Sequence, residues 1–287
     1  MTISSLVPAK EFEESVKHFP STLGWLSTNA AQIFYAFHTF QLRNLKMSGD
    51  VLEVGAHEAR SSVFFTNLLR DGETLHVSDL FDQQDLNISK SAGSSYAAWE
   101  RNFERFKSGD PNVVIHHGPS QNLDPVALGS NFRFAYLDGG HATDEVKADL
   151  ELAEAILVEG GVAVVDDTFN QDFPGTTEGV IAYCYKDDSK LVPLLCFETK
   201  VALVNKSYYE TYRSMLTEML DQGEHWFLPP QLLCGHEVLT IRFAGRWEVR
   251  SKVLKRNFPL AHQVLRSTKI AQNVFHRLRG ALSDRAK

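Results

Sequence analysis

Five short apolar runs alternate with helix-like segments between residues 50 and 167. Each run ends at glycine or an acidic residue: DVLEVG (50–55), ETLHVSD (73–79), NVVIHHG (112–118), FRFAYLD (132–138) and GVAVVDD (161–167). Strands that are apolar on both faces are typical of parallel sheets, because helices cover both sides of such sheets. The alternation therefore predicts an α/β fold with a doubly wound, Rossmann-like sheet and helices on both faces.

A helical segment lies between the fourth and fifth runs. Its apolar residues recur at helical spacing, at Val146, Leu150, Ala153 and Leu157. Glycine is a poor helix former, and two glycines follow the segment. The pattern predicts a helix that stops at Gly160-Gly161, before the fifth strand begins.

The pattern divides the chain into three parts. Residues 1–47 predict an N-terminal helical cover, because residues 22–42 have the composition of an amphipathic helix. Residues 48–205 hold the strand–helix alternation and form the predicted core domain. Residues 206–287 predict a C-terminal appendage of a helix and a hairpin, followed by a basic amphipathic helix.

Charge is distributed unevenly along the chain. Residues 242–287 contain twelve Lys or Arg and two acidic residues, whereas the whole chain has a net charge of −7. A basic tail on an acidic body can bind nucleic acid, an anionic membrane or an acidic partner. The simpler alternative is a helix that docks on the chain's own acidic body.

Cysteine usage and hydropathy predict a cytoplasmic protein. The three cysteines have neither metal-site spacing nor the even number of a disulfide framework. No run approaches the roughly 18 apolar residues of a membrane-spanning helix. The N-terminal residues have early acids and no apolar stretch, so we do not expect a signal peptide.

The first strand and the turn after it suit a nucleoside ligand. Gly55 allows a ligand to approach the backbone closely because it has no Cβ. Asp79 ends the next strand, where a carboxylate can bind both hydroxyls of a ribose. The sequence lacks G-x-G-x-x-G and a phosphate-binding Lys-Ser/Thr pair. We therefore expect an adenosine compound without phosphates.

These motifs in this order resemble class I S-adenosylmethionine-dependent methyltransferases. The resemblance covers roughly residues 48–180, and it is strongest to the metal-dependent O-methyltransferases of the macrolide-sugar and catechol types. The segments that carry it are E-x-G at 53–55, the acid at 79, GPSQNL at 118–123, YLDGGH at 136–141 and VVDD at 164–167. Two positions depart from the pattern: Ala59 replaces a second glycine, and Gly139-Gly140 follow Asp138, so no catechol-type substrate wall is carried over.

The resemblance implies S-adenosylmethionine as cofactor and assigns its contacts. The implied contacts are Glu53, Gly55, Ala56, Asp79, Gly118, Ser120, Gln121 and Asp138. It also implies that Asp138 binds magnesium and that His141 is the catalytic base.

The chemistry of methyl transfer to oxygen points to the same residues. A neutral hydroxyl is a poor nucleophile, and a bound Mg²⁺ lowers its pKa and orients it. Mg²⁺ prefers oxygen ligands, which Asp138, Asp166 and Asp167 supply at two neighbouring strand ends. His141 lies one short turn from Asp138 and can accept the hydroxyl proton, since the pKa of histidine is close to neutral.

Each of these residues also has an ordinary structural reading. Asp138 can belong to a turn, Asp166 and Asp167 can cap the next segment, and His141 can be a loop histidine. The turn-rich segment 168–183 predicts a wall or lid over the acceptor that becomes helical near Thr177. In it, Asn170 and Glu178 are candidates for contacts with sugar hydroxyls, or they are capping residues.

The sequence favours an S-adenosylmethionine-dependent O-methyltransferase that uses Mg²⁺ or another divalent ion. The expected acceptor is a hydroxyl of a small molecule, with a sugar or glycoside favoured. The alternatives are an RNA methyltransferase that uses the basic tail, and a non-catalytic cofactor-binding protein. No nucleic acid partner is expected, because the body is acidic and offers no base-stacking platform; a homo-oligomer and peripheral membrane contact through the tail remain open.

Overall fold

The computed structural model describes residues 6–91, 93–220, 225–227 and 230–243. The chain divides into two compact units, the first with residues 1–223 and 227–242 and the second with residues 224–226 and 243–287. The sheet core and the cavity belong to the first unit. The predicted appendage (206–287) is described only in part, and its basic amphipathic helix lies outside the described residues.

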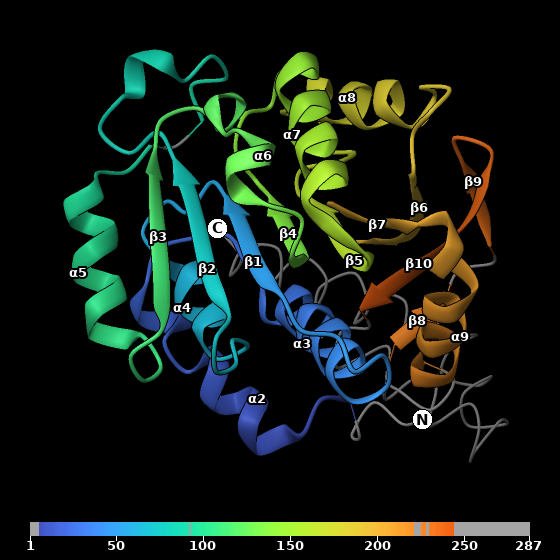
Figure 1. The fold of residues 1–287 in the computed structure, drawn as a ribbon, viewed down its shortest axis with the longest axis horizontal. Helices are drawn as coiled ribbons and strands as arrows, with labels where there is room; N and C mark the ends of the chain where they lie inside the picture. The colour runs from blue at the N-terminus through green and yellow to red at the C-terminus, as the bar shows by residue number, and fades with distance from the viewer. Residues whose placement is uncertain (1–5, 92, 221–224, 228–229, 244–287) are drawn as a thin grey trace, which may run out of the picture. The chain divides into compact units, whose positions relative to one another are not determined.

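The five predicted strands form a parallel sheet (Figure 1). They are β1 (Asp50–Val54), β2 (Thr74–Asp79), β3 (Asn112–His117), β4 (Phe132–Leu137) and β5 (Leu157–Val165). Their order is β3-β2-β1-β4-β5, so the direction of winding reverses between β1 and β4. In open α/β sheets, ligands bind at the carboxyl ends of the strands near this reversal. The predicted Rossmann-like fold is confirmed.

A hairpin that the sequence analysis did not predict extends the sheet beyond β5. Strand β7 (Lys200–Asn205) pairs antiparallel with β5, and β6 (Leu191–Phe197) pairs antiparallel with β7. Strand β10 (His236–Phe243) then pairs parallel with β6, and β9 (Gln231–Leu233) pairs antiparallel with β10. A further short strand is β8 (His225–Phe227). Because β7 runs against β5, its first residue lies beside the end of β5.

The predicted helix stop at Gly160-Gly161 is wrong. Helix α7 (Thr143–Ile156) ends at Ile156, and β5 begins at the next residue, so both glycines lie inside the strand. A Cβ on Gly160 would lie 2.2 Å from Cε of Met47 and 3.0 Å from the ring of Tyr208. Gly160 therefore packs closely against Met47 and Tyr208 within β5 and does not end a helix.

Helices cover both faces of the sheet. They are α2 (Ala9–Val16), α3 (Thr28–Arg43), α4 (Arg60–Thr66), α5 (Tyr96–Phe106), α6 (Pro125–Leu128), α7, α8 (Pro174–Cys184) and α9 (Tyr209–Leu220). Short 3₁₀ turns lie at Phe19–Ser21, Gln84–Leu86, Ser120–Asn122 and Lys206–Tyr208. Helix α3 begins at Thr28, six residues after the start of the predicted helical segment 22–42, because the Ser27 side chain caps it by accepting from the backbone N–H of Ala30 (3.0 Å).

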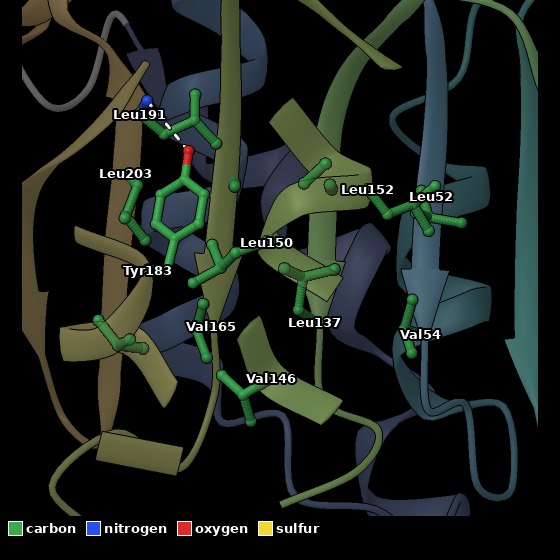
Figure 2. Packing of buried hydrophobic residues seen from close by; sticks show 14 of the residues in the cluster. Leu52, Val54, Leu137, Val146, Leu150, Leu152, Val165, Tyr183, Leu191 and Leu203 are labelled. Atoms are coloured by element: carbon green, nitrogen blue, oxygen red, sulfur yellow. Dashed lines mark hydrogen bonds between the residues drawn. The ribbon is translucent and has the colours of Figure 1, made fainter. Parts of the chain in front are cut away.

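The alternation of side chains along β4 divides the core between the two faces. Phe134 and Tyr136 point to the face where Phe34 of α3 and Phe65 of α4 lie, with ring centroids 5.2–6.0 Å apart. Leu137 points to the opposite face, where Figure 2 shows it among residues of α7 and β5. Each fully buried side chain of this size contributes roughly 1.5–3 kcal/mol to folding.

None of the helices in the described part of the chain combines the length and apolar character needed to cross a membrane.

Candidate active site

A cavity of about 800 Å³ opens at the carboxyl ends of the parallel strands. Its lining takes one or more residues from the end of each of these strands and from the start of β7: Gly55, Asp79, Gly118, Asp138, Asp166 and Lys200. The volume is in the range of sites for cofactors and small molecules. The strand ends bring together residues that are up to 145 positions apart in sequence.

The turn after β1 is built for close backbone approach. Gly55 has a φ of 82°, and a Cβ there would lie 1.9 Å from the backbone oxygen of Asp138. Ala59, which replaces the second glycine, is fully buried and has a φ of 69°. A left-handed conformation favours glycine, so the backbone at Ala59 is strained.

Asp79 holds this turn in place. Its Oδ2 accepts hydrogen bonds from the backbone N–H of Ala56 (2.7 Å) and of His57 (3.0 Å). Its Oδ1 accepts from the backbone N–H of Phe81 (2.6 Å). Asp79 also lines the cavity, so the carboxylate predicted to bind ribose has a second role that the sequence did not reveal.

Two of the predicted cofactor contacts lie beside the cavity. Of the described residues, the lining includes neither Glu53 nor Ala56. Glu53 is completely buried in β1, and its Oε2 accepts a hydrogen bond from the Ser62 hydroxyl of α4 (2.5 Å). Burial raises the pKa of Glu53 to about 8. The structure therefore places Glu53 as support for the start of α4, and Ala56 contributes its backbone N–H to Asp79.

The predicted cofactor contacts Ser120 and Gln121 lie on the lining and meet an acid that the sequence analysis missed. Ser120 donates its hydroxyl proton to Oδ1 of Asp149 on α7 (2.5 Å), and the Gln121 amide donates to Ser120 Oγ (3.1 Å). Burial raises the pKa of Asp149 to about 7. The missed signal was a carboxylate on the apolar face of a helix, between Val146 and Leu150.

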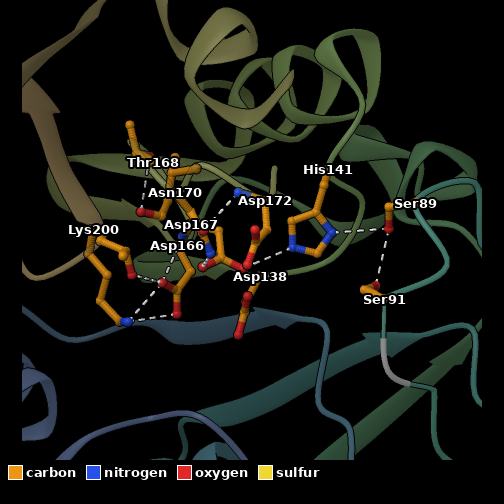
Figure 3. A network of polar contacts seen from close by, with 12 residues as sticks. Ser89, Ser91, Asp138, His141, Asp166, Asp167, Thr168, Asn170, Asp172 and Lys200 are labelled. Carbon is orange, nitrogen blue, oxygen red and sulfur yellow. Dashed lines mark hydrogen bonds and ion pairs between the residues drawn. The ribbon is translucent and has the colours of Figure 1, made fainter. Parts of the chain in front are cut away.

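Three carboxylates and an imidazole meet after β4 and β5 (Figure 3). The Tyr136 hydroxyl contacts Oδ2 of Asp138 (2.9 Å) and Oδ2 of Asp166 (2.5 Å). Burial, followed by the charge of Asp166, raises the pKa of Asp138 well above its usual range. The buried position and the neighbouring carboxylate thus both disfavour the charged form of Asp138.

His141 is held from three sides. Its Nε2 lies 3.2 Å from Oδ2 of Asp167, and its Nδ1 lies 3.2 Å from the hydroxyl of Ser89. Its ring stacks on Phe173, with centroids 3.9 Å apart. Burial alone would raise the pKa of Asp167, but hydrogen bonds from His141 and Asn170 lower it. With Asp167 ionised beside Nε2, Nδ1 is the nitrogen that can accept a proton.

Oxygens of Asp138 and Asp167 and a ring nitrogen of His141 all lie within 4.8 Å of one another. This group of donors could hold a divalent ion. Asp166, the third predicted ligand, lies outside the group. It instead pairs with Lys200, whose Nζ is 2.7 Å from its carboxylate. Burial disfavours the charge on Lys200, yet Asp166 and Asp138 raise its pKa, so the ammonium stays charged.

Of the two predicted substrate residues, one lines the cavity and the other does not. Asn170 lines the cavity and donates its amide to Oδ1 of Asp167 (2.8 Å). Glu178 is exposed on α8 and accepts from the Thr143 hydroxyl (2.7 Å), so it ties α8 to the start of α7 and is absent from the described lining. The lining also has an apolar lip, formed by Trp25, Leu86 and Ile88, which are 63%, 44% and 71% exposed. The sequence analysis did not identify this lip.

Comparison with known proteins finds a family match for part of the chain. Residues 52–168 match a family described as a methyltransferase domain. Among solved structures, the O-methyltransferase NovP is 16% identical and has a TM-score of 0.54, with 71% of this chain and 96% of that chain covered. A comparison with curated proteins found no significant match.

Two further solved structures are more distant in shape. S-adenosylhomocysteine-bound PaMTH1 from Podospora anserina is 15% identical, with a TM-score of 0.47 over 70% of this chain and 88% of that chain. The TDP-rhamnose 3'-O-methyltransferase CalS11 is 17% identical, with a TM-score of 0.46 over 68% and 93%. Likeness at such identities concerns the fold alone.

The family match includes the turn after β1, the carboxylate that ends β2 and the acids after β4 and β5. The order of the parallel strands agrees with it. Residues 52–168 of this chain therefore match a methyltransferase domain, in a fold similar to that of the O-methyltransferase NovP.

Proposed function

We propose that this enzyme transfers the methyl group of S-adenosylmethionine to a hydroxyl oxygen of a small molecule, with a sugar or glycoside as the favoured acceptor. One observation carries the proposal. A single cavity joins the Gly55–Asp79 side, which suits an adenosine compound, to the side where Asp138, Asp167 and His141 meet. The acceptor class rests on the resemblance to sugar O-methyltransferases and on the polar side chains of this second side.

The residues present fit a divalent ion. Asp138 and Asp167 offer oxygen ligands, and Mg²⁺ is commonly bound by one or two carboxylates together with substrate and water. Burial and the charge of Asp166 raise the pKa of Asp138, and a cation bound beside it would favour the ionised carboxylate. When bound, the ion lowers the pKa of the acceptor hydroxyl and orients it.

His141 removes the proton in this proposal. Its Nε2 is engaged by Asp167, and its Nδ1 faces the Ser89 hydroxyl. An acceptor hydroxyl that takes the place of the Ser89 hydroxyl would deliver its proton to Nδ1. Asp167 then stabilises the charged imidazole, and the stacked Phe173 ring fixes the orientation of the imidazole ring.

The proposal is tested by mass spectrometry of a panel of glycosides incubated with the enzyme, S-adenosylmethionine and Mg²⁺. The expected result is a gain of one methyl group in at least one glycoside, lost in EDTA and restored by Mg²⁺. Methylation that continues at full rate in EDTA would contradict the proposed role of the divalent ion. If RNA is methylated and no glycoside is, the acceptor is a nucleic acid and the proposed small-molecule acceptor is wrong.

A further inference from the structure

We propose that Lys200 is a permanent counter-ion for Asp166, so that Asp166 positions the site while the divalent ion is bound by Asp138 and Asp167. This inference rests on the metal-assisted function proposed above. It changes the expected ligand set, because the three aspartates do not have equal access to an ion.

The fold places Lys200 at Asp166 through strand pairing. Strand β7 is antiparallel to β5, and Val201 is the register partner of Val165. The residue before Val201 therefore lies beside the residue after Val165. Lys200 Nζ is 2.7 Å from both Oδ1 and Oδ2 of Asp166, and both side chains are 4% exposed.

The carboxylate of Asp166 is already saturated by the protein's own donors. Besides Lys200, Oδ1 accepts from the backbone N–H of Asp167 (2.7 Å) and the Thr199 hydroxyl (3.2 Å). Oδ2 accepts from the Tyr136 hydroxyl (2.5 Å). A carboxylate has about four lone-pair sites, so an ion could reach Asp166 only by displacing one of these donors.

Asp138 and Asp167 are different. Among the described residues, Asp138 is contacted on Oδ2 alone, by Tyr136, which leaves Oδ1 open. Asp167 has one contact on each oxygen, from Asn170 and from His141, and its side chain is 22% exposed. Both line the cavity, and in the described part of the chain neither carboxylate forms an ion pair with a lysine or arginine. The geometry thus gives Asp166 a built-in cation and leaves its two neighbours for an external one.

Removing a charged residue near an ion changes affinity even when that residue is not a ligand. A charge-matched pair of double variants avoids this difficulty. Asp166→Asn with Lys200→Met removes one negative and one positive charge. Asp138→Asn with Lys200→Met removes the same charges, so both variants keep the wild-type net charge. Replacing both partners of a buried ion pair by neutral residues is often tolerated.

The measurement is Mn²⁺ binding to the full-length enzyme, followed by the electron paramagnetic resonance signal of free Mn²⁺. We expect Asp166→Asn/Lys200→Met to bind Mn²⁺ within roughly threefold of wild type, and Asp138→Asn/Lys200→Met to lose at least about tenfold, or ~1.4 kcal/mol. Circular dichroism melts confirm folding; if the Met variants do not fold, Lys200→Gln replaces Lys200→Met in both.

The outcomes separate this inference from the proposed function. Equal losses in the two double variants would make Asp166 a ligand and overturn the inference, while leaving a metal-assisted enzyme. Wild-type enzyme that binds no Mn²⁺ would overturn the inference and the metal assistance, whereas the methyl transfer itself is tested separately by mass spectrometry. Unequal losses in the expected order support Lys200 as the fixed counter-ion.

Discussion

His141 is the residue whose surroundings best distinguish a base from a metal ligand. Its Nε2 is used by Asp167, and its Nδ1 is available for a proton. We expect His141→Ala to lower the methyl-transfer rate by roughly 10²- to 10⁴-fold, the usual contribution of a general base. Mn²⁺ affinity should be retained. Single-turnover kinetics and Mn²⁺ titration measure the two effects.

The matched control is His236→Ala, on β10 and absent from the described cavity lining, which should leave the rate unchanged. A variant at position 141 that keeps the full rate would assign proton removal to solvent or to a carboxylate. Loss of Mn²⁺ binding together with the rate would make His141 a ligand.

Asp79 has two tasks that one substitution removes together. We expect Asp79→Ala to weaken S-adenosylmethionine binding, since hydrogen bonds to a charged group contribute roughly 1.5–3 kcal/mol each. The backbone N–H groups of Ala56, His57 and Phe81 would also lose their acceptor. Isothermal titration calorimetry measures the affinity, with exposed Asp82→Ala as control. Unchanged affinity in Asp79→Ala would put the ribose site elsewhere.

At the scale of elements, β2 and β3 carry a pair of histidines whose protonation opposes folding. His76 Nδ1 lies 3.1 Å from His116 Nε2, and the rings stack with centroids 5.4 Å apart. Burial lowers the pKa of both, and for His76 the His116 charge lowers it further, although Asp50, 3.9 Å away, opposes this. The folded protein therefore holds these histidines neutral at a pH where the unfolded chain is already protonated.

The sign of the pH dependence follows from the lowered pKa. Below the unfolded pKa of about 6.5, the unfolded state binds more protons, so the free energy of unfolding falls as the pH falls. We expect Tm to decrease below pH 6.5 and to decrease less steeply in His116→Gln. Thermal melts from pH 7.5 to 5 test this, with His236→Gln as control. Parallel curves for wild type and His116→Gln would contradict the expectation.

The elements also differ in how far the sequence predicted them. The parallel strands follow from apolar runs that end in glycine or acid, because those signals are local. The boundary between α7 and β5 was misplaced, since both glycines lie inside β5, where Gly160 packs against Met47 and Tyr208 from distant segments. The β6–β7 hairpin was missed although its strands, LVPLLCF and KVALVN, are apolar.

At the scale of the whole molecule, the sequence allows two roles for the basic tail: an anchor for an anionic partner, or a helix that docks on the acidic body. If residues 252–287 anchor the enzyme, their deletion should abolish salt-sensitive binding to anionic vesicles and leave Tm unchanged. If the tail docks on the acidic body, as the simpler reading holds, deletion should lower Tm, and added salt should reduce the difference by screening. Vesicle sedimentation and thermal melts decide between them. A truncated chain that shows neither effect would contradict both readings.

The sequence by itself determined the fold class, the parallel strands and the strand-end positions of Asp79, Asp138 and Asp167. These depend on side-chain periodicity and on where each run stops, and both can be read within a few residues. Only the tertiary structure decided which acidic side chains are already paired within the protein and which remain available to bind a ligand or an ion. Antiparallel pairing of β7 with β5 brings Lys200 to Asp166 across 34 positions of sequence, and α7 packing brings Asp149 to Ser120. Such contacts depend on which distant segments pack together, and the local periodicity of side chains does not name the partner of a strand or helix.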